Sequence, residues 1–174
     1  MTITPDDKDW TWVLERRCAE CGFDAESVDA KDVAGLLRGA CSTWHTVLTE
    51  RDDVRMRPNP DVWSPLEYGC HVRDVFRVYT GRVQRMLAED GPHYANWDQD
   101  VTALDDDYAS QDPYLVADDL SIDGAALADL FGSVRDEQWA RTGFRSDGAA
   151  FTVDSISRYF IHDIVHHLHD VGAA

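Results

Sequence analysis

The chain has 174 residues, of which 44% are hydrophobic, so it is long enough for one domain with a substantial core. Its formal net charge of -17 argues against binding to nucleic acid or anionic membranes through bulk electrostatics, because both need clustered lysine and arginine. No apolar run is long enough to span a membrane, and the first residues lack the basic and apolar segments of a signal peptide. We therefore expect a cytoplasmic protein with no nucleic-acid or membrane partner.

Residues 1–29 are predicted to form an N-terminal arm that packs its aromatic side chains onto a single domain, residues 30–174. In this arm Cys18 and Cys21 are spaced like half of a zinc knuckle. A structural zinc site needs a second pair, and the two remaining cysteines, Cys41 and Cys70, are isolated in the sequence. We interpret Cys18 and Cys21 as small buried residues, with metal or redox chemistry as the alternative.

Two amphipathic helices are predicted in the first half of the domain. The first spans about residues 30–50, where apolar residues recur at the i, i+3, i+4, i+7 spacing. The second begins at a clear signal: Ser64 is the N-cap, Pro65 is the first helical residue and Glu67 completes a capping box. It runs to about residue 89 and carries His71 at the edge of its inner face.

A long irregular segment, residues 90–111, follows the second helix. Segments of this length are functional, or they are structural crossovers between parallel-running helices, and both interpretations stay open here. Its aromatic content predicts a packed loop that covers or lines a pocket. The candidate substrate-binding residues in it are Trp97, Asn96 and Asp98.

The third predicted helix starts at Asp112-Pro113 and continues to about residue 138, with Gly124 indicating a close approach. A turn over residues 139–150 contains Arg145, which with Arg141 is a candidate partner for substrate carboxylates. Thr152 caps the last helix, which ends near residue 171. The predicted fold class is therefore all-α: a four-helix bundle with a long crossover and an N-terminal arm.

The last helix holds four of the seven histidines within eight residues. His162 and His166 lie one turn apart, the spacing at which a helix supplies two ligands to one metal ion, whereas His167 points elsewhere. His71 of the second helix is the candidate third ligand. The alternatives are a solvated polar face for this stripe and a core-edge histidine with one hydrogen bond for His71. The helical wheel places the site in an open cleft at the side or end of the bundle.

The residues Trp63-Ser64-Pro65, followed by His71 and by His162-x-x-x-His166, resemble the DinB-like metal-binding four-helix bundles. That superfamily includes mycothiol-dependent maleylpyruvate isomerases and bacterial thiol S-transferases. Its second helix supplies one histidine, and its last helix supplies a histidine or glutamate followed four residues later by a histidine. The resemblance covers about residues 30–171 and implies His71, His162 and His166 as metal ligands.

The resemblance also implies a function. We expect a thiol-dependent S-transferase or isomerase that acts on a small electrophile, with a mycothiol- or bacillithiol-type thiol as cosubstrate and a homodimeric assembly. Zinc is the favoured divalent metal, with nickel and iron as alternatives. The alternative functions are a non-catalytic metal-binding bundle that serves in stress or partner binding, and a hydrolase that uses metal-bound hydroxide.

The candidate catalytic residues on the last helix are Asp163 and His169. Asp163 or Asp170 could hold a ligand imidazole in its correct tautomer. His169 and His167 are candidates for proton transfer or for replacing a metal ligand.

Overall fold

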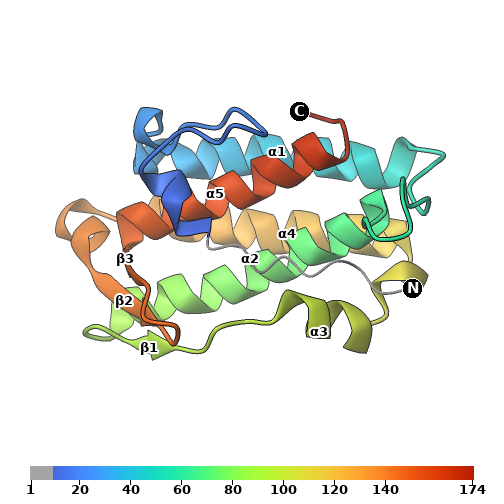
Figure 1. Cartoon of the computed structure of the whole chain (residues 1–174). Coiled ribbons are helices and arrows are strands. Elements are labelled where there is room, and N and C mark those ends of the chain that lie inside the picture. The colour runs from blue at the N-terminus through green and yellow to red at the C-terminus, as the bar shows by residue number, and fades with distance from the viewer. Residues whose placement is uncertain (1–9) are drawn as a thin grey trace.

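Residues 10–174 are described by a computed structural model (Figure 1). Its four long helices are α1 (Val33–Glu50), α2 (Pro65–Ala88), α4 (Pro113–Ser133) and α5 (Val153–Asp170). In Figure 1, α1 and α5 run in one direction and α2 and α4 run in the other. Helices α1 and α2 each pack mainly against α4 and α5, so they lie diagonally across the bundle. The predicted all-α four-helix bundle is confirmed.

The arm and the connections contain short elements. The arm holds three 3-10 helices, η1 (Trp10–Leu14), η2 (Ala25–Ser27) and η3 (Ala30–Asp32), all of which contact α5. The first nine residues of the predicted arm lie outside the described residues. Strands β1 (His93–Tyr94), β2 (Thr142–Arg145) and β3 (Ala150–Thr152) form a small sheet at one end of the bundle (Figure 1). Phe144 of β2 pairs with His93 in a parallel register and with Ala150 in an antiparallel register.

The segment between α2 and α4 is a crossover that carries the chain back along the bundle, because these two helices run parallel. It contains α3 (Gln99–Asp105) and η4 (Tyr108–Ser110). The buried Tyr108 hydroxyl donates a 2.5 Å hydrogen bond to Asp74 of α2, and Arg73 donates to Asp74 at 2.9 Å and to Gln111 at 2.7 Å. Satisfied buried polar groups of this kind fix the crossover on α2.

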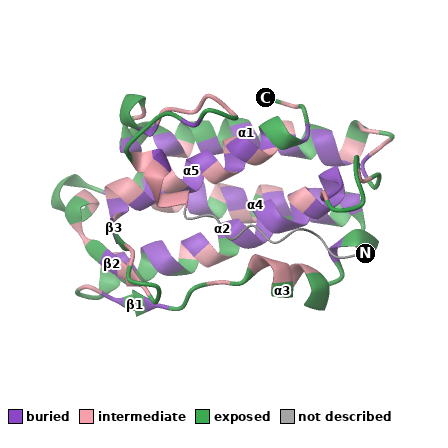
Figure 2. Cartoon of the chain, viewed as in Figure 1, coloured by how far each residue is buried: buried purple, intermediate pink, exposed green. Residues whose placement is uncertain are grey.

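Figure 2 shows the buried residues along the facing sides of the four helices, with exposed residues on the outer faces. The predicted helix starts at Ser64, Asp112 and Thr152 are all present as N-caps. The end of α4 differs from the sequence expectation, because the chain leaves the helix at Val134 and residues Asp136–Ala140 form the 3-10 helix η5. Val134 is buried in extended backbone there, so packing ends the helix before the periodic pattern does. None of the described helices is long and apolar enough to cross a membrane.

Gly124 of α4 lies very close to side chains of both α1 and α2. A Cβ at this position would lie 2.3 Å from the sulfur of Cys41 in α1 and 2.9 Å from the ring of Phe76 in α2. We predict that Gly124→Ala destabilises the protein by about 1–3 kcal/mol, because the core would have to shift. Gly132→Ala in the same helix is the matched control, since nothing lies within 4 Å of its added Cβ. The control should be neutral or slightly stabilising through helix propensity, as measured by urea unfolding; equal losses in both variants would contradict the packing argument.

Glu67 is a buried carboxylate at the start of α2. Burial raises its pKa, but hydrogen bonds from Arg57 and Ser64 outweigh burial and hold the pKa below its ordinary value of 4.5. Its contribution to stability is therefore complete above pH 4.5 and is lost as the pH falls through the lowered value. We predict that Glu67→Gln costs about 1–3 kcal/mol at neutral pH. The gap to the wild type, followed by urea unfolding across a pH series, should close in acid, and a gap independent of pH would contradict this role.

Candidate metal centre

Helix α5 carries two i, i+4 pairs of potential ligands that are offset by one residue. Asp163 and His167 face His71 of α2, and their ligand atoms all lie within 4.8 Å of one another. His162 and His166 face the arm instead, where they meet two cysteines at similarly short separations. The three predicted ligands are thus divided: His71 lies in one group, and His162 and His166 lie in the other. One residue along a helix is a rotation of about 100°, which separates the two groups.

The carboxylate of Asp163 lies between the two histidines of its group. Its Oδ2 is 3.6 Å from Nε2 of His71, and its Oδ1 is 3.5 Å from Nε2 of His167. These separations are long for hydrogen bonds. Ligands bound at about 2.1 Å to a tetrahedral ion lie about 3.4 Å apart, so the spacing fits a shared cation.

The ring of His71 is the strongest indication of a bound cation in this group. Its side chain is 1% exposed, and among the described residues neither of its ring nitrogens has a hydrogen-bond partner. Burial lowers its pKa, although Asp163 acts in the opposite direction, so the ring is neutral at neutral pH and offers a lone pair. A buried polar group without a partner costs about 1–3 kcal/mol, and metal coordination would remove that cost.

His167 is oriented from behind by a second carboxylate. Its Nδ1 lies 2.8 Å from Asp170, which leaves Nε2 facing Asp163. Burial lowers the pKa of His167, but Asp163 and Asp170 outweigh burial and raise it to about 9. Burial likewise raises the pKa of Asp163, but His167 and His71 outweigh it and hold that pKa far below its usual range. A cation bound between them would replace the proton of His167.

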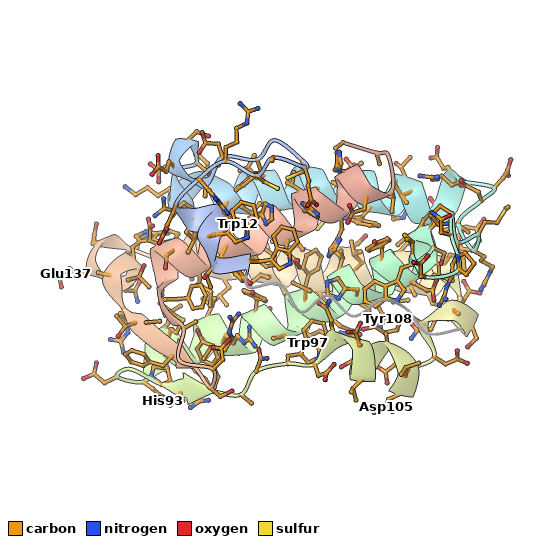
Figure 3. The ribbon with its side chains drawn as sticks, in the orientation of Figure 1. Trp12, His93, Trp97, Asp105, Tyr108 and Glu137 are labelled. Atoms are coloured by element: carbon orange, nitrogen blue, oxygen red, sulfur yellow. The ribbon has the colours of Figure 1, made fainter. Side chains whose placement is uncertain are left out.

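Aromatic rings surround this group. Trp97 of the crossover stacks on His71 at a centroid distance of 5.5 Å and an interplanar angle of 11°, and Trp63 lies 5.4 Å from the same ring. Tyr68 lies 4.9 Å from the ring of His167. Figure 3 shows Trp97 on the crossover side of α2, near the middle of the length of that helix. The side chain of Asp163 is 34% exposed, so the group is not fully enclosed by protein.

The other predicted residues of the crossover and turn have structural contacts. Asp98 caps α3 by accepting from the backbone of Asp100 and Val101, and the backbone of exposed Asn96 donates to Ser146. Arg145 is paired with Asp147 at 2.7 Å. Of the predicted substrate-binding residues, Trp97 is the one found against the histidines.

The structure places two further predicted residues, Arg141 and His169, away from the group of His71, Asp163 and His167. Arg141 donates to the carbonyl oxygens of Met86 and Glu89, which ties the turn to the end of α2. His169 has a side chain that is 47% exposed and lies outside both ligand groups.

A depression of about 440 Å³ lies on a different face, lined by residues of α1 and α4 that include His45 and Ser121.

Three residues of this group were not predicted from the sequence: His167 as one of its three potential ligands, and Tyr68 and Trp63 as aromatic rings that contact its histidines. The sequence does contain a signal for the first, since Asp163-x-x-x-His167 has the same one-turn spacing as the histidine pair beside it. The rings of Trp63 and Tyr68 pack on each other at the start of α2, with a centroid distance of 5.5 Å. Their second contact, with the histidines, depends on how α5 packs against α2.

The comparisons with known proteins agree with this architecture. The sequence profile described as the DinB superfamily matches residues 47–171. This chain belongs to the DinB superfamily. A search of curated proteins finds no significant match. Among solved structures, this DinB-superfamily chain is similar to YfiT from Bacillus subtilis, described as a probable metal-dependent hydrolase with an unusual four-helix bundle topology. The TM-score is 0.72 at 16% identity, with 83% of this chain and 86% of YfiT covered.

We predict that His71→Ala and His167→Ala each remove about one equivalent of bound divalent metal, because a site with three protein ligands does not survive the loss of one. The measurement is metal analysis of protein purified without a histidine tag, with circular dichroism to verify the fold. His45→Ala is the control, since His45 is exposed on α1 and belongs to neither ligand group. Unchanged metal content in both variants would rule out this centre.

Proposed function

We propose that this DinB-superfamily protein is a divalent-metal-dependent enzyme whose metal is held by His71, Asp163 and His167. The observation that carries the proposal is the buried ring of His71, whose two nitrogens have no hydrogen-bond partner among the described residues while a carboxylate lies 3.6 Å away. Two histidines and one carboxylate are a donor set for zinc and for iron. A divalent cation bound there would act as a Lewis acid and lower the pKa of a coordinated thiol or water.

The chain's own residues have three tasks in this proposal. Asp170 holds His167 in one orientation, as an outer carboxylate does for a metal-bound imidazole. Trp63 and Trp97 enclose His71 and limit the access of water on that side. The partly exposed side chain of Asp163 marks the side from which a substrate would enter.

We infer a thiol-dependent S-transferase or isomerase as the reaction class, with a mycothiol- or bacillithiol-type thiol as cosubstrate and a small electrophile as substrate. The support is the DinB membership together with a site that offers three protein ligands and so leaves a coordination position for a small nucleophile. The tryptophan and tyrosine rings favour an electrophile with an apolar or flat portion.

A metal-dependent hydrolase is the second candidate, favoured by the similarity to YfiT, which carries that description. The two reactions use the same residues and differ in the nucleophile. A homodimer and a cytoplasmic location remain parts of the proposal, and gel filtration at several protein concentrations would test the first.

We predict that turnover of a panel of small electrophiles requires an added thiol and a divalent metal. Protein stripped with a chelator should recover activity with zinc, nickel or iron. His71→Ala should lower kcat/KM at least as much as changes to outer-shell partners do, which is about 10–100-fold. Turnover without thiol would assign a hydrolase instead. Metal binding with no turnover under either condition would assign the non-catalytic alternative.

A further inference from the structure

The second ligand group joins segments from opposite ends of the chain. Cys18 and Cys21 of the arm meet His162 and His166 of α5, with all four ligand atoms within 4.8 Å of one another. The sulfur of Cys18 lies 3.7 Å from Nδ1 of His166. Cys18, His162 and His166 are 1%, 3% and 6% exposed, and Cys21 is half-buried. The sequence supplies half of a zinc knuckle, and the fold supplies its missing pair as histidines.

The backbone of the arm is shaped to present both sulfurs to α5. The N–H of Gly22 donates to the carbonyl of Cys18 at 2.9 Å, and the N–H of Cys18 donates to the carbonyl of Phe23 at 2.8 Å. Gly22 has a φ of +77°, in the left-handed region that favours glycine. Arg17 adds a 2.7 Å hydrogen bond to the Gly22 carbonyl. These bonds close residues 18–23 into a tight turn with the two cysteines near its ends.

The surroundings of the two histidine rings suit metal ligands. Nε2 of His166 lies 3.3 Å from the carboxylate of Glu20, which leaves Nδ1 facing Cys18. A carboxylate behind a metal-bound imidazole is a common arrangement that fixes the ring and its tautomer. Nε2 of His162 is buried and has no hydrogen-bond partner among the described residues. An uncompensated buried nitrogen is costly, and a bound cation would satisfy it.

We propose that Cys18, Cys21, His162 and His166 bind one zinc ion in a closed, four-coordinate site that fixes the N-terminal arm on α5. With Zn–S bonds of about 2.3 Å and Zn–N bonds of about 2.0 Å, a sulfur and a nitrogen on a tetrahedral ion lie about 3.5 Å apart, close to the separation seen here. Two thiolates neutralise the charge of the ion, and binding releases both thiol protons. Four protein ligands leave no open position, which makes the site structural and not catalytic.

The surroundings agree with a structural role. The ring of Trp10 lies 5.6 Å from that of His162 and 5.0 Å from that of His166, and Phe23 lies 5.5 Å from His162. These rings cover the group from the arm side. The zinc site would also fix the rotation of α5, because the adjacent residues Asp163 and His167 belong to the other group. This inference does not rest on the proposed function, since the two groups share no ligand.

Cobalt substitution tests the proposal on the full-length wild-type protein. Co²⁺ replaces zinc in tetrahedral sites, and sulfur-to-cobalt charge transfer absorbs in the near ultraviolet only where a cysteine is a ligand. The centre at His71 has no sulfur, so this band reports the arm site alone. We expect the band to appear by the second equivalent of cobalt, because the centre at His71 can also bind cobalt, and to vanish when zinc is added. Absence of the band in reduced protein would overturn the proposal.

Substitutions identify the ligands. Cys18→Ser with Cys21→Ser should lose the band and one equivalent of zinc, and trypsin should then cleave the arm at Arg16 and Arg17 several-fold faster. Cys41→Ser is the control, because Cys41 is a buried free cysteine outside both ligand groups, and it should retain zinc and band. His71→Ala should also keep the band, even if the catalytic proposal fails. Full zinc content in the double variant, or a disulfide between Cys18 and Cys21 in protein purified with its metal, would refute the site.

Discussion

The structure depends on how α5 satisfies the polar groups that it buries. This helix closes the bundle between α1 and α2, and it does so with two histidines under 10% exposed and an aspartate and a third histidine that are partly covered. Leaving such groups without partners costs about 1–3 kcal/mol each, a large part of the net stability of a domain of this size. These groups form two clusters of potential metal ligands on adjacent faces of one helix, and a cation bound in each cluster would remove this cost.

The two clusters differ in their donor atoms, and this difference is the reason that we propose a catalytic role for one and a structural role for the other. His71, Asp163 and His167 offer nitrogen and oxygen to a cation and leave positions free, which suits chemistry on a small ligand. The cluster with Cys18 and Cys21 offers two sulfurs and two nitrogens and would enclose an ion, which suits a fixed connection between chain segments. Soft thiolates also favour zinc over harder cations. In the two proposals, one helix thus holds a reactive metal centre on one face and a structural zinc site on the other.

The packing of the arm and the crossover controls access to α5 on both faces. The crossover places Trp97 on His71, and the hydrogen bonds among Tyr108, Asp74 and Arg73 keep it there. The arm places Trp10 and Phe23 over the other histidines. Segments that have little periodicity in sequence therefore enclose both clusters, and they derive their order from contacts with the bundle and not from their own propensity.

Much of the fold was predictable because its signals are local. Ser64, Asp112 and Thr152 begin helices through hydrogen bonds to residues two or three positions away, and the close approach at Gly124 follows from the absence of a side chain. The end of α4 and the way the crossover docks on α2 were not predictable in this way. Both depend on burial of particular side chains, Val134 and Tyr108, against distant parts of the chain.

The sequence by itself determined the bundle, the helix starts and the presence of ligand residues at one-turn spacing on the last helix. It could not decide which of two overlapping pairs faces α2, because His162 and His166 have the same spacing as Asp163 and His167. A single residue of offset turns the helix by about 100°, and only the packing of α5 against α2 and the arm selects the rotation. The tertiary structure alone therefore grouped His71 with Asp163 and His167, and brought the cysteines of the arm to the other pair.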